Sequence, residues 1–328
     1  MTKTEFIEKW HSEKPIYEAW GAFVKKTIED RLREADSALD LGRFLKIANA
    51  PRLKEDDSLI EKAFHRDKPY EDPYLEITDK VGLRLVVLLT EDITRIQRII
   101  ERCELWSFSL DRDYEQEREA RPLEFAYQSK HYVVRSNVEV FYSGITVPIG
   151  VPCEIQLRTL LQHAHSELTH DNIYKVQQGT TVTNQVRRTV AKSMALIEAV
   201  DDFFCSAIVQ LAEATAPERE TYAFLAKLYQ EKIGIPHGNG KTNQIVLHAF
   251  RERLTPDLQH EVAAFLEQHA FIAEQVRKHA KSQQLFRQPW VLLAYYLVQQ
   301  SPRQTKEQWP LTFDEIEPIY TDLGKNVT

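Results

Sequence analysis

The segment at residues 152–159 carries the clearest chemical pattern in the chain, because polar and apolar residues alternate along it. Successive side chains of a β-strand point to opposite faces. A strand here would place Glu154, Gln156 and Arg158 on one face and the apolar residues between them on the other. A carboxylate, an amide and a guanidinium in a row predict a surface that holds a metal ion beside an anion.

A second group of polar residues lies near residue 52. Arg52 and Lys54 would point the same way from an extended segment, and Ser58 and Lys62 lie one turn apart on a helix that follows. Four such groups could grip a polyphosphate. The alternative is a solvated surface, because residues 52–68 contain as many acidic as basic side chains.

Asp79 precedes a nearly continuous apolar run at residues 81–89, which is typical of a buried central strand. A carboxylate at the end of such a strand is well placed to hold Mg²⁺, and Gly82 lets another group approach the backbone closely. A regular strand would put Asp79 and Arg84 on opposite faces, so we expect a bulge near Gly82 if both serve one site. The alternative is a turn aspartate and an edge arginine.

An aromatic and polar segment follows at residues 125–132. If it is extended, Tyr127, Ser129 and His131 share one face and could stack on and hydrogen-bond a nucleobase. The alternative is a strand that packs on a helix.

The next helix contains residues that could form a zinc site. His163, Glu167 and His170 recur at helical spacing there. Because no H-E-x-x-H motif is present, a polar helix face is the better interpretation.

A sheet flanked by helices must bring these segments together. Apolar spacing predicts helices within residues 1–50 and an amphipathic helix at 91–103, with short strands at 131–135, 138–142 and 145–149. After residue 160 the chain reads as helical. The glycines and proline at 233–240 predict a linker between a domain of residues 1–232 and a helical domain of residues 241–328.

Composition narrows the class of protein. The 328 residues are 43% hydrophobic and 28% charged, enough for one large domain and a smaller one. A net charge of −7 argues against binding of nucleic acid through the overall charge of the protein. The three separated cysteines suit a reduced compartment, and no run is apolar enough for a signal or a membrane span. We expect a cytoplasmic protein without membrane contact.

Taken in order, these motifs resemble the synthetase domain of the RelA/SpoT family over about residues 1–215. Five spaced motifs in the right order make the resemblance specific. The family pattern R-x-K with S-x-x-x-K corresponds here to Arg52, Lys54, Ser58 and Lys62, and the pattern D-x-x-G-x-R corresponds to Asp79, Gly82 and Arg84. The pattern G-Y-x-S-x-H-Y corresponds to Tyr127, Ser129, His131 and Tyr132, and the pattern E-I-Q-x-R-T to Glu154, Gln156, Arg158 and Thr159. The last pattern, H-x-x-x-Y-K, corresponds to His170, Tyr174 and Lys175.

The resemblance implies an α/β (α+β) fold, in which a mixed β-sheet flanked by helices is related to nucleotidyltransferases, followed by an all-helical C-terminal segment. It implies a Mg²⁺-dependent pyrophosphokinase that moves the β,γ-pyrophosphate of ATP onto the 3′-hydroxyl of GDP or GTP, making (p)ppGpp. It also implies the roles of single residues. Asp79 and Glu154 are catalytic and hold the metal. ATP and its phosphates are bound by Arg52, Lys54, Ser58, Lys62 and Arg84. The acceptor nucleotide is bound by Arg112, Arg121, Tyr127, Ser129, His131, Gln156, Arg158, His170 and Lys175.

Departures from the family pattern leave alternatives open. Ala126 replaces the glycine before the stacking tyrosine, and the loop at 115–122 is acidic-leaning, with Arg112, Arg118 and Arg121 as its only candidates for the acceptor's 5′ phosphates. A second interpretation is therefore a toxin-like enzyme, of toxin–antitoxin type, that pyrophosphorylates the 3′ end of tRNA. In that case residues 241–328 would be regulatory and would bind the synthetase domain or a protein partner.

Two other functions fit the sequence less well. A catalytically inactive nucleotide sensor would not need to retain both Asp79 and Glu154. Alarmone hydrolysis uses a separate upstream helical domain in this family, and only about 50 residues precede the motifs here. The sequence leaves the oligomeric state open, including a homo-oligomer.

Overall fold

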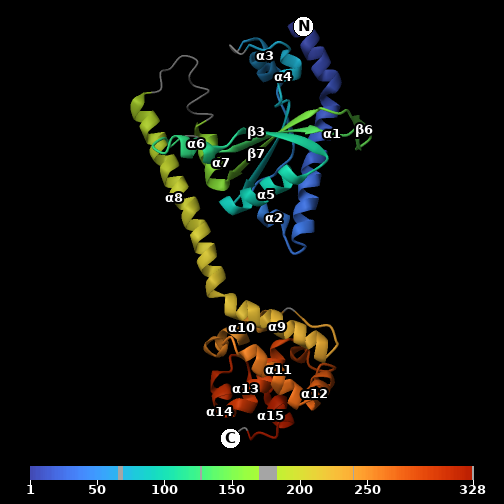
Figure 1. The fold of residues 1–328 in the computed structure, drawn as a ribbon, viewed down its shortest axis with the longest axis vertical. Helices are drawn as coiled ribbons and strands as arrows, with labels where there is room; N and C mark the ends of the chain where they lie inside the picture. The colour runs from blue at the N-terminus through green and yellow to red at the C-terminus, as the bar shows by residue number, and fades with distance from the viewer. Residues whose placement is uncertain (66–68, 126–127, 170–182, 239, 327–328) are drawn as a thin grey trace. The chain divides into compact units, whose positions relative to one another are not determined.

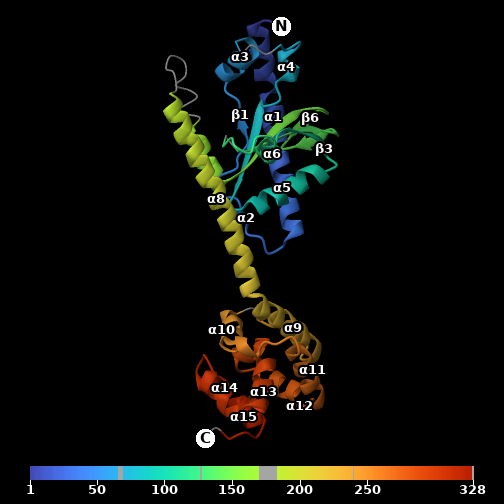
Figure 2. The same cartoon turned by 60° about the vertical axis from the view of Figure 1, so that its left-hand side comes forward.

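The computed structural model describes the chain except residues 66–68, 126–127, 170–182, 239 and 327–328. The chain divides into two compact units, Met1–Ala207 and Ile208–Thr328, and each has its own hydrophobic core. The first unit is a β-sheet flanked by helices, and the second is helical (Figures 1 and 2). The predicted fold class, a mixed sheet with helices followed by a helical C-terminal segment, is confirmed.

The first unit contains seven strands among its described residues: β1 (Arg52–Leu53), β2 (Val81–Val87), β3 (Trp106–Arg112), β4 (Lys130–Ser136), β5 (Val140–Tyr142), β6 (Ile145–Val147) and β7 (Pro152–Thr159). Its helices are α1 (Lys3–Ala35), α2 (Leu41–Phe44), α3 (Asp56–Phe64), α4 (Pro73–Glu76), α5 (Thr90–Arg102), α6 (Tyr114–Ala120), α7 (Leu160–Thr169) and α8 (Asn184–Ala214), the last of which crosses the boundary between the units.

Five strands form the main sheet in the order β1-β2-β7-β4-β3, and β5 and β6 form a separate hairpin. Strands β2 and β7 are parallel, and the other neighbours are antiparallel. The register sets Gly82 beside Glu154, and it sets Gln156 between Arg84 and His131. Because paired residues point to the same face, a row of polar side chains crosses the three central strands.

The opposite face of the sheet is apolar and is covered by α1 and α5. Strand residues such as Leu83 and Ile155 are buried there together with Ile93, Ile96 and Ile100 of α5, whereas Ile99, the fourth residue of the apolar stripe that we predicted for this helix, is only partly buried. The alternation of β7 therefore holds as expected: its apolar residues enter this core, and Glu154 and Gln156 face the other way.

Two elements near residues 106–120 differ from the prediction. We expected a loop at 115–122 and did not predict a strand at 106–112, whereas β3 forms the sheet edge and α6 follows it at once. Strand β3 buries only Trp106 among its seven residues, so its sequence shows little of the apolar pattern that identifies a strand. Pairing with β4, rather than local sequence, defines this edge.

The second unit consists of α9 (Ala216–Lys232), α10 (Lys241–Ala249), α11 (Leu258–Gln268), α12 (Phe271–His279), α13 (Trp290–Gln300), α14 (Pro302–Gln308) and α15 (Glu317–Asp322), with short turns of 3₁₀-helix η3 (Arg251–Arg253), η4 (Gln284–Arg287) and η5 (Phe313–Glu315). Helix α13 is buried on nearly all sides and forms the centre of this core. In the described part of the chain, no helix is long and apolar enough to cross a membrane.

The boundary between the units lies earlier than the expected linker at 233–240. The reason is that α9, which we expected in the first domain, buries Leu225, Leu228 and Tyr229 in the core of the second unit. The glycines of the 233–240 segment connect α9 to α10 inside that unit.

Candidate active site

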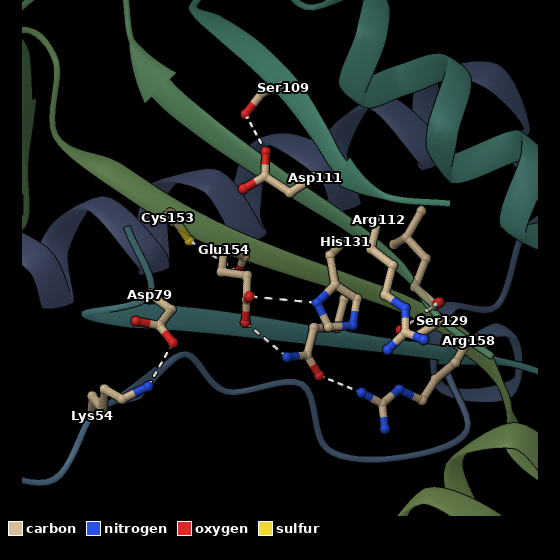
Figure 3. Close-up of polar contacts among 12 residues, drawn as sticks. Lys54, Asp79, Ser109, Asp111, Arg112, Ser129, His131, Cys153, Glu154 and Arg158 are labelled. Atoms are coloured by element: carbon tan, nitrogen blue, oxygen red, sulfur yellow. Dashed lines mark hydrogen bonds and ion pairs between the residues drawn. The ribbon is translucent and has the colours of Figure 1, made fainter. Parts of the chain in front are cut away.

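Two carboxylates lie near one another where β2 and β7 are paired. Glu154 extends from β7, and Asp79 lies two residues before the first residue of β2 (Figure 3). They are close enough for the charge of Asp79 to act on the pKa of Glu154, although this is the smallest of the influences on that group. The bulge that we expected near Gly82 is not needed, because Asp79 precedes the strand and the pairing of β2 with β7 runs unbroken from Gly82 to Val87.

Two lysines neutralise Asp79. Lys54 Nζ lies 2.5 Å and Lys62 Nζ 2.8 Å from the same oxygen, Asp79 Oδ2. Lys54 directly follows β1, and Lys62 comes from α3, the helix that we predicted after the extended segment. Burial alone would raise the pKa of Asp79, but the two ammonium groups hold it below its ordinary value. Asp79 is therefore ionised at neutral pH.

The other oxygen of Asp79 indicates that a cation fits here. Among the residues that the structure describes, Asp79 Oδ1 is buried and has no hydrogen-bond partner. Mg²⁺ commonly takes one or two carboxylates and completes its shell with water and substrate phosphates. Asp79 and Glu154 suit such a site. No group of three or more His, Cys, Asp or Glu side chains in the described ranges could hold a metal by itself, so water or a bound phosphate would have to supply further ligands.

Glu154 is held by neighbours on two strands. Gln156 Nε2 donates a 2.7 Å hydrogen bond to Glu154 Oε2, and His131 Nδ1 lies 3.5 Å from Oε1. Burial raises the pKa of Glu154, but the hydrogen bonds from these neighbours keep it below its ordinary value. The contacts continue from Gln156, whose Oε1 accepts from Arg158, and Arg158 also donates to Ser166 Oγ at 2.8 Å.

Two of the predicted acceptor-binding residues, Arg158 and Ser129, are buried. Arg158 is 1% exposed, and Ser129 is fully buried with its hydroxyl donating to the carbonyl of Leu157. Gln156 and His131 are half-buried and remain on the polar face. Sequence reasoning missed Ser166, because we examined the helix that contains it only for metal ligands.

The structure separates the predicted ATP-binding residues into two places. Lys54 and Lys62 lie at Asp79, whereas Arg84 donates a 2.9 Å hydrogen bond to Glu167 of α7. The backbone of Arg52 pairs with Gly82 at the sheet edge, and the side chains of Arg52 and Ser58 are exposed.

The arginines near α6 are all paired with carboxylates. Arg112 makes two hydrogen bonds to Glu117, at 2.8 and 3.0 Å, in the bidentate arrangement that also suits phosphate. The two other pairs are Arg118–Glu198 at 3.2 Å and Arg121–Glu124 at 3.3 Å. Tyr127, His170 and Lys175, together with Ala126 and Tyr174, lie outside the described residues.

Comparison with known proteins places this site in a family. Residues 51–179 match the model described as "Region found in RelA / SpoT proteins". This part of the chain belongs to the RelA/SpoT family. The two carboxylates Asp79 and Glu154 and the two lysines Lys54 and Lys62 all fall within the matched residues.

Solved structures of similar fold come from several bacteria. The small alarmone synthetase 1 of Bacillus subtilis is 18% identical, and the match covers 63% of this chain and 99% of that one at a TM-score of 0.50. A GTP pyrophosphokinase family protein of Streptococcus pneumoniae is 21% identical, with 63% and 97% covered and a TM-score of 0.48. No curated protein matches the chain significantly. At 18% identity and a TM-score of 0.50, the first of these structures shows a likeness of fold alone.

Proposed function

We propose that the protein is a Mg²⁺-dependent pyrophosphokinase that transfers the β,γ-pyrophosphate of ATP to the 3′-hydroxyl of GDP or GTP, making (p)ppGpp. The observation that carries this proposal is the pair Asp79 and Glu154, flanked by Lys54 and Lys62, on the sheet of a RelA/SpoT region. The small alarmone synthetase of similar fold supports it.

The reaction needs positioning and charge neutralisation more than covalent chemistry by the protein. The 3′-oxygen of the acceptor attacks the β-phosphorus of ATP, the bond from that phosphorus to the α-phosphate oxygen breaks, and AMP leaves. Lys54 and Lys62 would bind the phosphate oxygens on which negative charge accumulates. Mg²⁺, held by Asp79 and Glu154, would neutralise further charge on the triphosphate.

Glu154 is better suited to orienting the 3′-hydroxyl than to removing its proton as a strong base. Its pKa is held below the ordinary value of a glutamate, so the carboxylate is ionised and accepts hydrogen bonds but binds a proton weakly. The proton released from the hydroxyl would pass through Glu154 or solvent as the new bond forms.

A transfer assay tests the proposal. The protein is incubated with γ-labelled ATP and Mg²⁺, and GDP, GTP or bulk tRNA is supplied as acceptor. We expect label in the guanine nucleotide, and Asp79→Asn or Glu154→Gln should reduce transfer by roughly 100-fold or more with an unchanged circular dichroism spectrum. Full activity in both variants would overturn the site assignment.

One observation favours a second acceptor. All three arginines that could bind the acceptor's 5′ phosphates are paired with carboxylates, and the terminal adenosine of tRNA would not need such a clamp. The second candidate is therefore pyrophosphorylation of the tRNA 3′ end, with residues 208–328 in a regulatory role. Labelled tRNA without labelled nucleotide would establish it, and the absence of label from both would favour a nucleotide sensor. Either enzyme would work in the cytoplasm, where these acceptors occur.

A further inference from the structure

A groove of about 460 Å³ lies between the last turn of α1 and the C-terminal half of α5. Its volume is in the range of small-molecule sites in proteins. The groove is separate from the polar face of the sheet, because α1 and α5 cover the opposite, apolar face. The residues of the proposed reaction therefore do not line it.

The charged groups of the groove are mostly guanidinium groups. Arg31 comes from α1, and Arg95, Arg98 and Arg102 come from α5, at a spacing that places the last three along one side of the helix. Glu34 is the one carboxylate among the described residues that line the groove. This concentration of positive charge contrasts with the net charge of −7 of the whole chain.

The existing ion pairs leave part of this charge uncompensated. Arg31 lies 3.8 Å from Glu34, and Arg95 lies 3.6 Å from both Asp36 and Asp92. No carboxylate of the described residues pairs with Arg98 or Arg102 in this structure. Neighbouring guanidinium groups repel one another, and an anion bound between them would reduce this repulsion.

Helix dipoles account for only part of the pattern. A cation in the last turn of a helix is favoured by the partial negative charge at that end, which explains Arg102 in the last turn of α5. It does not explain Arg98, which lies one turn earlier, or the convergence of Arg31 from a different helix on the same groove.

We propose that this groove binds a small anion that carries two or more phosphates, such as a nucleoside di- or triphosphate, away from the catalytic face. Arg98 and Arg102 would donate bidentate hydrogen bonds to the phosphate oxygens, for which the planar guanidinium is well shaped. Ile99, which also lines the groove and is partly exposed, would offer an apolar surface to a ring.

Calorimetric titration of the full chain with inorganic tripolyphosphate tests the proposal. The double variant Arg98→Ala/Arg102→Ala should lose one binding site or bind roughly tenfold more weakly, because each lost contact is a charge-assisted hydrogen bond. The matched control is Arg33→Ala/Arg43→Ala, which removes the same charge from exposed positions outside the groove and should bind as the full chain does. Hydrogen–deuterium exchange should show protection of residues 95–103 by tripolyphosphate.

A third variant distinguishes the effect of charge on the affinity from the effect of bidentate hydrogen-bond geometry. Arg98→Lys/Arg102→Lys keeps the charge but loses the bidentate geometry, so its affinity should lie between those of the other two. Equal weakening by the alanine double variant and by the control would overturn the proposal, since it would show a general charge effect. Unchanged binding in the alanine double variant would overturn it too, as would binding of a single-stranded oligonucleotide at residues 95–103 without binding of tripolyphosphate.

Discussion

At the level of single residues, the two carboxylates of the site are kept ionised by different neighbours. Asp79 depends on the full charges of Lys54 and Lys62, whereas Glu154 depends on hydrogen bonds with His131 and Gln156. Burying two carboxylates close together is costly unless cations or donors compensate them. Here the two lysines and the hydrogen-bond donors provide that compensation.

The hydrogen bond from Gln156 predicts a change in pH dependence. A lowered pKa keeps Glu154 ionised, and this state is lost as pH falls through the folded pKa. Gln156→Leu removes one donor, so the pKa of Glu154 should rise and the acid limb of the pH–rate profile should move to higher pH. We expect the rate at neutral pH to fall on the order of tenfold, as when a partner of a metal-binding residue is removed.

Pre-steady-state transfer assays across acidic and neutral pH would measure this change. Gln268→Leu, at an exposed position in α11, serves as the control and should leave the profile unaltered. If the acid limb of the pH–rate profile lies at the same pH in Gln156→Leu as in the original chain, Gln156 does not act through Glu154.

At the level of elements, the sheet edge and α6 together restrain Arg112. A register shift between Leu110 and Arg112 sets Arg112 opposite His131, and Glu117 of α6 then holds the guanidinium through two hydrogen bonds. Acceptor choice would then depend on whether a phosphate can displace that carboxylate.

Glu117→Gln tests this dependence. Removing the carboxylate charge should make Arg112 more available to a 5′ phosphate, so the KM for GTP should fall by roughly two- to fivefold while the KM for ATP stays the same. Steady-state kinetics with each substrate varied would show it. Glu119→Gln, also exposed on α6, is the control, and an equal effect of both variants would indicate a general change in charge.

A second prediction concerns the docking of α8 on the sheet unit. Thr159 at the end of β7 donates a 2.7 Å hydrogen bond to Asp201 of α8, which is 2% exposed. Burial raises the pKa of Asp201 to about 6 from an ordinary value of 3.8. Protonation is therefore easier in the folded state, and the folded protein should lose stability as pH rises from about 4 to about 6 and then level off.

Asp201→Asn should remove this loss and keep an acceptor for Thr159. We expect the free energy of unfolding to increase by roughly 1–2 kcal/mol above pH 6 and to be unchanged near pH 4. Urea denaturation at the two pH values would measure the difference. A variant that is less stable than the original chain at pH 7 would contradict the assignment of a buried, easily protonated carboxylate.

At the level of the whole molecule, the two cores determine where the chain can be divided. Because α9 buries Leu225, Leu228 and Tyr229 in the second core, a chain of residues 1–232 would expose these apolar side chains. A chain of residues 1–214, which ends with α8, would not carry them. We expect residues 1–214 to melt cooperatively and residues 1–232 to aggregate.

Size-exclusion chromatography and thermal melts of both truncated chains would check this expectation. A monodisperse 1–232 chain together with an aggregating 1–214 chain would place α9 in the first unit instead. Transfer activity of the 1–214 chain, compared with the full chain, would then report whether residues 215–328 restrain the proposed reaction.

The sequence by itself determined the features that depend on local periodicity. The alternation of residues 152–159 predicted which side chains share a face, and the apolar run at 81–89 predicted the central strand, because strand geometry repeats every two residues. The helix that bears Lys62 was predictable for the same kind of reason. The order of the motifs then indicates a RelA/SpoT region.

The tertiary structure alone decided which charged groups meet. Lys54 and Lys62 both contact Asp79, Arg158 donates a hydrogen bond to Gln156, and Arg112 donates hydrogen bonds to Glu117. Residue type shows that each side chain is charged or polar, but not its partner, since partners distant in sequence are set by packing and strand register. The membership of α9 in the second core was hidden for the same reason: an amphipathic helix shows that it has an apolar face, but not which core buries it.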